Sequence, residues 1–246
     1  MNKTIILISL LLLTAGCSLS ALPEECIQEQ ERCIEEIAAQ GTHELCKQLD
    51  ESQINSCILQ VAVELQDIDI CEEADSLRDR CINAFAYNQQ DHTICSQIDE
   101  REEQDSCVSY IAVNSKNLTL CEEAGLRENS CKTTIAREEV LPEVCETIED
   151  KFDQETCWSL VATAGSMPEL CEKIEAEDHE EGFRYLRESC YSKLGIQLGN
   201  ETLCLQASSW VHVDPCLERV AKNKQDPQIC DLLLHKSPDE CKQEIH

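Results

Sequence analysis

The chain has 246 residues, 19 of them cysteine, and a formal net charge of −29. This charge argues against nucleic acid and anionic lipid head groups as partners, because the chain repels them, and it favours cations or basic surfaces. Phe, Tyr, Trp, Gly and Pro are all sparse, which argues against a large aromatic core and favours helices over strands.

The first residues have the features of an export signal. A basic start at Met1–Lys3 precedes an apolar run from Ile5 to Leu13, and small residues follow it. The run is far shorter than the roughly 20 residues that a membrane-spanning helix needs. We therefore expect residues 1–16 to be a signal peptide.

The end of this signal resembles the lipobox of prokaryotic lipoproteins, in the stretch Leu13-Thr14-Ala15-Gly16-Cys17. The resemblance implies cleavage before Cys17 and a diacylglyceryl group on its thiol. Residues 17–25 would then be a lipidated tether at the extracytoplasmic face of the cell membrane. The alternative is an ordinary signal peptide in which Cys17 is incidental.

The remaining cysteines recur with a period of about 25 residues, which is typical of a solenoid or another array of repeats. Each repeat has a first and a second cysteine, and from Cys57 onward a constant step of 14 residues leads from each second cysteine to the next first cysteine. A constant step predicts a fixed structural unit, and the variable steps predict loops. The cysteines concerned are Cys26, Cys33, Cys46, Cys57, Cys71, Cys81, Cys95, Cys107, Cys121, Cys131, Cys145, Cys157, Cys171, Cys190, Cys204, Cys216, Cys230 and Cys241.

A helix is predicted to start four residues before each first cysteine. Most of these positions hold Asp, Asn or Thr, which are good N-caps, and three are followed by proline (Pro142, Pro168 and Pro227). A second helix is predicted around each second cysteine, with a large apolar residue one turn later and usually Ala after it. The pattern predicts an all-α solenoid of about nine short disulfide-stapled helical hairpins over residues 26–246.

An acidic residue or Asn always lies two positions before the second cysteine. We interpret these residues as first-turn groups that interact with the helix dipole; a cation site on one helix face is the alternative. The positions are Glu31, Asn55, Asp79, Asp105, Asn129, Glu155, Glu188, Asp214 and Asp239.

Two disulfide schemes are compatible with the spacing. Pairing within each repeat uses 18 of the 19 cysteines, leaving Cys17 for the lipid, whereas pairing across the 14-residue step leaves Cys26 and Cys241 single. Parity favours the first scheme, although spacing does not decide connectivity. Each bridge would stabilise the fold by roughly 3 kcal/mol, offsetting a small apolar core.

The segments Asp226–Cys230 and Pro168–Ile174 resemble cysteine-rich repeat lipoproteins of archaea and bacteria. The resemblance covers nearly the whole mature chain. It implies a location at the cell surface and carries no known chemistry.

The sequence contains no C-x-x-C, nucleophile elbow, P-loop or dinucleotide fingerprint, so we expect no enzymatic activity, no cofactor and no metal site. The long segment between Cys171 and Cys190 is a candidate binding loop. There His179 and its acidic neighbours suit a divalent cation, and Phe183 and Tyr185 suit a partner protein. A solvated acidic loop whose aromatic residues fold back on the hairpin is the alternative.

Two N-x-T patterns, at Asn117 and Asn200, match glycosylation acceptors but also occupy predicted N-caps, and capping is the preferred interpretation. Together these features predict a non-catalytic scaffold that binds another envelope or extracellular protein, but not nucleic acid. A structural or protective envelope component and an acidic, divalent-cation-binding surface protein are the alternatives.

Overall fold

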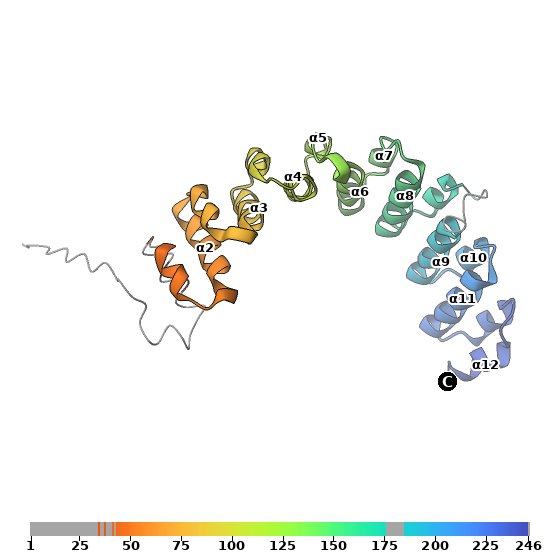
Figure 1. Ribbon diagram of the computed structural model, residues 1–246. Coiled ribbons are helices and arrows are strands. Elements are labelled where there is room, and N and C mark those ends of the chain that lie inside the picture. The colour runs from red at the N-terminus through yellow and green to blue at the C-terminus, as the bar shows by residue number, and fades with distance from the viewer. Residues whose placement is uncertain (1–33, 35–36, 38–40, 42, 176–184, 246) are drawn as a thin grey trace, which may run out of the picture. The chain divides into compact units, whose positions relative to one another are not determined.

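A computed structural model describes residues 34, 37, 41, 43–175 and 185–245. The predicted signal peptide, the tether and Cys26 and Cys33 lie outside these residues. By its contacts the chain divides into an N-terminal part, Met1–Phe85, and a C-terminal part, Ala86–His246, and each is described by itself. Every regular element of the described residues is helical (Figure 1), as the sequence predicts.

Short and long elements alternate along the chain. From Cys46 onward, each repeat has a short element around its first cysteine and, except in the last repeat, a longer helix around its second. The short elements are η2 (His43–Gln48), η3 (Ile68–Leu77), η4 (His92–Gln97), α5 (Leu118–Cys121) followed by η5 (Gly125–Arg127), α7 (Pro142–Cys145), η6 (Pro168–Lys173), α10 (Glu201–Gln206) and η7 (Pro227–Leu232). The helices around the second cysteines are α2 (Glu51–Leu65), α3 (Arg78–Gln89), α4 (Arg101–Ser115), α6 (Glu128–Glu139), α8 (Lys151–Gly165), α9 (Leu186–Leu198), α11 (Trp210–Lys224) and α12 (Pro238–Gln243).

The predicted N-caps start the short elements. Five of these caps accept a hydrogen bond from a backbone N–H of their own first turn, which satisfies a donor that the helix leaves free. Where Leu141 and Met167 take the position instead, proline follows and begins the helix. The five capping residues are Asp67, Asp91, Asn117, Asn200 and Asp226.

A tight link joins each long helix to the next short element. The residue nine positions after the second cysteine adopts the left-handed conformation, as in Lys116 (φ 56°) and Gly199 (φ 61°). The N–H of the following residue then bonds back to the carbonyl of the small residue in the last turn, for example Asn117 to Ala112 over 2.9 Å. This helix ending fixes the direction of the chain and places the cap of the next repeat immediately after it.

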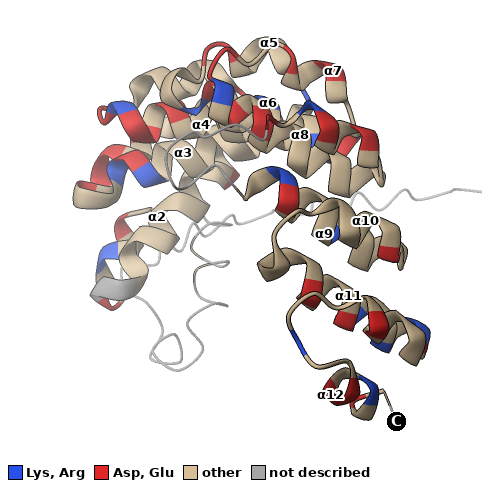
Figure 2. Cartoon of the chain, turned by 90° about the vertical axis from the view of Figure 1, so that its right-hand side faces the viewer, with Lys and Arg blue, Asp and Glu red and all other residues tan. Residues whose placement is uncertain are grey.

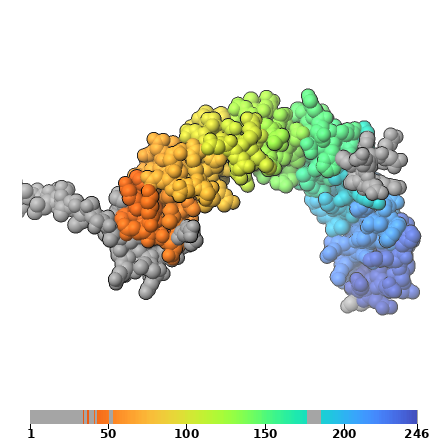
Figure 3. Space-filling view, in the orientation of Figure 1, coloured from red at the N-terminus to blue at the C-terminus, as the bar shows by residue number. Residues whose placement is uncertain are grey.

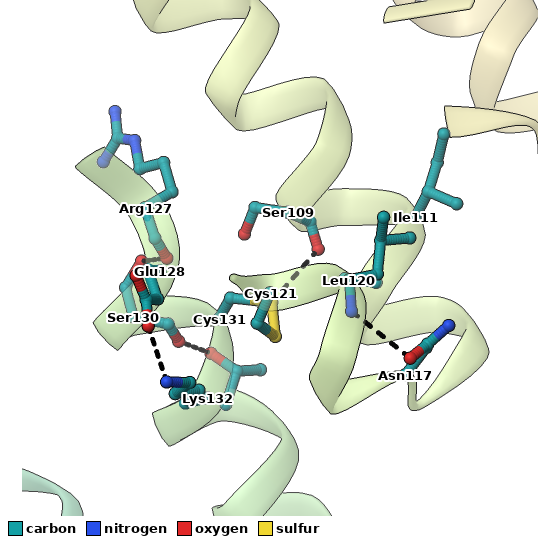
Figure 4. The surroundings of a disulfide bond; sticks show 12 residues. Ser109, Ile111, Asn117, Leu120, Cys121, Arg127, Glu128, Ser130, Cys131 and Lys132 are labelled. Atoms are coloured by element: carbon teal, nitrogen blue, oxygen red, sulfur yellow. Dashed lines mark hydrogen bonds and ion pairs between the residues drawn. A yellow bond between two sulfur atoms is a disulfide. The ribbon is translucent and has the colours of Figure 1, made fainter. Parts of the chain in front are cut away.

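Eight disulfides lie within the described residues, and each joins the two cysteines of one repeat. Their Cα–Cα distances of 5.5 to 5.8 Å are ordinary for a disulfide. The surroundings of Cys121–Cys131 are shown in Figure 4, where the Cys131 sulfur lies 3.8 Å from the carbonyl oxygen of Ser109 on the preceding long helix. The bridges are Cys46–Cys57, Cys71–Cys81, Cys95–Cys107, Cys121–Cys131, Cys145–Cys157, Cys171–Cys190, Cys204–Cys216 and Cys230–Cys241.

In the C-terminal part, each repeat packs on its neighbours in chain order. Helix α4 contacts α6, α6 contacts α8, α8 contacts α9 and α9 contacts α11, and the short elements pack against the adjoining long helices. The same order is visible in the space-filling view of this part (Figure 3). The core is correspondingly thin, built from the disulfides and one apolar stripe per helix, such as Ile111 and Ala112 on α4. Nearest-neighbour packing of this kind is that of a solenoid.

The prediction that these acidic residues and asparagines lie in the first turn is wrong for four helices. Asn55, Asp105, Glu155 and Asp214 occupy the second turn, because α2, α4, α8 and α11 begin six residues before the second cysteine. The three carboxylate side chains among them are buried, with 1%, 1% and 0% of their surface exposed. The helix dipole therefore does not explain them, and their partners lie in the following repeat, as described below.

Candidate partner-binding patch

Exposed aromatic and aliphatic side chains gather in the last three repeats. The chain has only two Trp residues, and they differ sharply in burial: Trp158 is 8% exposed, whereas Trp210 is 50% exposed. Trp210 meets the ring of His235, which follows the exposed Leu234, and the exposed Val211 and a second ring pair lie beside it in sequence. We call this set the aromatic patch; its members are Tyr185, Trp210, Val211, His212, Leu234 and His235.

Two ring pairs link side chains of successive repeats. The rings of Tyr185, at the start of α9, and His212 lie 5.5 Å apart between centroids. The rings of Trp210 and His235 lie 5.0 Å apart. Because Trp210 and His212 are two residues apart in the first turn of α11, their rings point to different sides of that helix, and each meets a ring of a different neighbouring repeat. Each pair is tilted, at 44° and 46°, an arrangement that neighbouring rings commonly adopt.

A buried carboxylate holds the loop that carries His235. Asp214, one turn after Trp210 on α11, accepts hydrogen bonds from the backbone N–H groups of Leu234, His235 and Lys236 over 2.7, 2.9 and 2.9 Å. Three consecutive N–H groups thus converge on one side chain and fix the backbone of residues 234–236. The loop is held in the position that places the imidazole of His235 against the indole of Trp210.

The same bonds keep this carboxylate ionised. Burial raises the pKa of Asp214, but the three backbone N–H donors lower it by more, so that the net pKa lies below the ordinary value of 3.8. The charged form is the one that three donors require. The carboxylate therefore holds the loop at any pH well above that ordinary value.

Other repeats use the same device with an offset of about 20 residues. Asp105 accepts from the N–H of Leu126 over 2.9 Å, and Glu155 from the N–H of Glu175 over 3.2 Å. Glu188 accepts from the hydroxyl of Ser208. A side chain on Gly125 would place its Cβ 2.5 Å from the Asp105 carboxylate, so only glycine fits there. In these four repeats the acidic residue two positions before the second cysteine thus bonds to the following repeat; we call Asp105, Glu155, Glu188 and Asp214 the inter-repeat carboxylates.

The structure describes one of the three residues named in the predicted binding loop. Tyr185 belongs to the aromatic patch, and its side chain is 44% exposed. His179 and Phe183, like Cys17, lie outside the described residues. Sequence reasoning missed Trp210 and His235 as partners, although one of only two Trp residues at the first position of a polar-capped helix was a usable signal.

Both N-x-T patterns are capping turns. The side-chain Oδ1 of Asn200 accepts from the backbone N–H of Thr202 over 3.0 Å and from its hydroxyl over 2.6 Å. Asp91 makes the same two bonds to Thr93, over 3.0 and 2.7 Å. Because Asp91 caps its helix with the same two bonds at an equivalent position, helix capping explains the N-x-T pattern. Asn117 likewise accepts from the N–H of Leu120 over 3.3 Å.

The exposed indole of Trp210 has the features of an interface residue. A half-exposed indole with a fixed ring neighbour can anchor a partner, because Trp and Tyr contribute much of the binding energy of protein interfaces. Within the described residues, no group of three or more His, Cys, Asp and Glu side chains is placed to hold a metal ion. No helix of the described residues is both long and apolar enough to cross a membrane.

Comparison of the chain with protein-family models, with curated proteins and with solved structures finds no match.

Proposed function

We propose that this protein is a lipid-anchored, non-catalytic scaffold of the extracytoplasmic face of the membrane, which binds a partner protein through the aromatic patch. The observation that carries the proposal is the exposure of Trp210 beside His235 in a loop that the buried Asp214 holds in place. A side chain that is already held in one position loses less conformational entropy when a partner binds it, so association through it is more favourable.

The partner we propose has an apolar pocket for the indole and a basic rim. Asp and Glu residues outnumber Lys and Arg along the helices (Figure 2), in keeping with the net charge of −29. Such a field attracts a basic surface and repels an acidic one, so it increases the rate of association with the former. Association should therefore slow as salt is added, because salt screens the field.

The disulfides support an extracytoplasmic location. Eight bridges in one chain are stable in an oxidising compartment and unusual in the cytosol. The lipobox-like stretch that ends at Cys17 supports anchoring by a lipid. We do not propose nucleic acid as a partner, because the net charge of −29 repels it.

The binding proposal is tested by cross-linking in the native envelope, followed by measurement of affinity for the captured protein. Trp210→Ala should lower that affinity by about 2 kcal/mol, or roughly 30-fold, as a central anchor does. Leu126→Ala is the matched control, because Leu126 is 82% exposed and lies outside the patch. Equal affinities for the two variants would refute the patch as the binding site. Self-association that depends on Trp210, measured by sedimentation, would identify a second copy of the chain as the occupant and overturn the proposed partner.

The anchoring proposal has its own test. The intact mass of the protein extracted from membranes should exceed that of the chain cleaved before Cys17 by a diacylglyceryl-sized increment. Cysteine alkylation should add nothing until the bridges are reduced. A mass without the increment would contradict the anchor, and alkylation before reduction would contradict the fully bridged state.

A further inference from the structure

A groove lies between α4 and α6, in repeats other than those of the aromatic patch. Its volume is about 390 Å³, within the ~300–1,000 Å³ of ordinary ligand sites. One wall comes from α4, and the other comes from Arg127 and the first two turns of α6. Figure 4 shows Ser109 of α4 across from Arg127 and Ser130. The lining residues are Ser106, Ser109, Tyr110, Val113, Arg127, Ser130 and Thr134.

The hydroxyl groups of the groove act mainly as acceptors. Ser106, Ser130 and Thr134 each donate their proton to a backbone carbonyl of the preceding turn, over 2.8, 3.0 and 2.8 Å. Their lone pairs remain for a ligand, because a hydroxyl has one donor and two acceptor sites. These oxygens consequently favour a ligand that presents O–H or N–H groups.

Arg127 supplies donors to the same groove. Its guanidinium donates one bond to Glu102 over 3.1 Å, which uses one of five N–H groups. The groove therefore presents acceptors from the hydroxyls and donors from the guanidinium. A ligand hydroxyl matches both, since it donates and accepts at once.

The ring of Tyr110 supplies an apolar platform. This side chain is 64% exposed, so its ring is accessible to a ligand. Val113, one turn later, extends the apolar surface. A ligand that fits must have a flat apolar face as well as hydroxyl groups.

The lining of the groove favours an uncharged ligand. Arg127 is the one charged residue among the seven that line it, and none of them is a carboxylate. Glu102 pairs with the Arg127 guanidinium over 3.1 Å and offsets its charge. The groove therefore presents polar hydroxyls and paired charge, with no unpaired charge to attract an ion.

From these contacts we propose that the groove binds a neutral saccharide, with one sugar ring against Tyr110 and its hydroxyls bonded to Ser130, Thr134 and Arg127. A sugar has apolar C–H faces and hydroxyl edges, which are the two surfaces that the groove offers. The site is independent of the aromatic patch, so its failure leaves the proposed scaffold function intact.

The test titrates the full chain with uncharged trisaccharides of glucose, mannose, galactose and N-acetylglucosamine, followed by backbone amide NMR shifts. One of these probes should shift the amides of residues 106–113 and 127–134. Tyr110→Ala should weaken that binding by about tenfold, and Tyr110→Phe should preserve it because the ring stays. Tyr87→Ala is the matched control, since it removes a 45% exposed tyrosine that lies outside both the groove and the aromatic patch.

Three results would overturn the proposal. The first is that none of the four probes shifts the groove amides. The second is that Tyr110→Ala binds as tightly as the unsubstituted protein while its spectrum shows an intact fold. The third is that a hexalysine peptide or a trigalacturonate binds these amides more tightly than every neutral sugar, which would mean that the groove selects charge.

Discussion

Replacing Asp214 with Asn should release the loop that carries His235. The two carboxylate oxygens accept three backbone N–H bonds, one on Oδ1 and two on Oδ2, and the side chain is fully buried. An amide keeps one acceptor oxygen and turns an N–H₂ group toward the remaining donors. A hydrogen bond to a charged group contributes about 1.5–3 kcal/mol, and an unsatisfied buried donor costs about 1–3 kcal/mol, so we expect a loss of roughly 3 kcal/mol.

Hydrogen exchange measures this loss where it occurs. Roughly 3 kcal/mol corresponds to about 100-fold faster exchange of the amides of residues 234–236, provided that these amides exchange by local opening. Asp231→Asn is the control, because its ion pair with Lys242 is exposed and contributes about 1 kcal/mol at most. Unchanged exchange at residues 234–236 in Asp214→Asn would refute the argument that the carboxylate fixes the loop.

Further predictions concern packing, backbone strain and pH. Gly195→Ala should lower the free energy of unfolding by about 1–3 kcal/mol, seen as a lower thermal midpoint, since the new Cβ would lie 2.8 Å from the disulfide sulfurs of the next repeat. Val140→Asn should raise the free energy of unfolding by about 1 kcal/mol, seen as a higher thermal midpoint, because a β-branched residue at φ 56° is strained and Asn tolerates that conformation. The folded-state pKa of Asp214 is lowered, so its contribution is present above about pH 4 and is lost as pH falls through the folded value; acid titration followed by exchange at residues 234–236 tests this. Lys236 has a raised pKa from its bond to Glu218, so that contribution is present below pH 10.5 and is lost only as pH rises through the folded value, which an NMR titration of the amine would detect.

Much of the fold could be predicted from the sequence because its determinants are local. An N-cap such as Asp91 acts within two residues, and the proline at Pro142 acts at its own position. The within-repeat disulfides follow from parity as well as spacing, and the eight bridges match that scheme. The constant 14-residue step predicted the fixed unit that joins one second cysteine to the next first cysteine, and the long helix, left-handed residue and N-cap occupy it.

The partners of the inter-repeat carboxylates could not be predicted from the sequence, because most of these partners are backbone N–H groups. Any residue carries an N–H, so the residues at 126, 175 and 234 give no sign in the sequence that a carboxylate 20 positions earlier requires them. The kind of bond also changes with the residue at this position. In α6 the equivalent Asn129 donates from its side-chain amide to Asp153 over 2.8 Å, whereas in α4 Asp105 accepts from the backbone N–H of Leu126 over 2.9 Å.

These carboxylates also explain why a chain with so thin a core can present a defined surface. Each disulfide stabilises its own hairpin but does not fix one hairpin relative to the next. In the C-terminal part, the helix contacts and buried acceptors such as Asp214 supply that second level of order. The patch around Trp210 depends on it directly, because His235 reaches the indole from the following repeat. A binding surface built across repeats therefore requires both the covalent bridge within a hairpin and the carboxylate between hairpins.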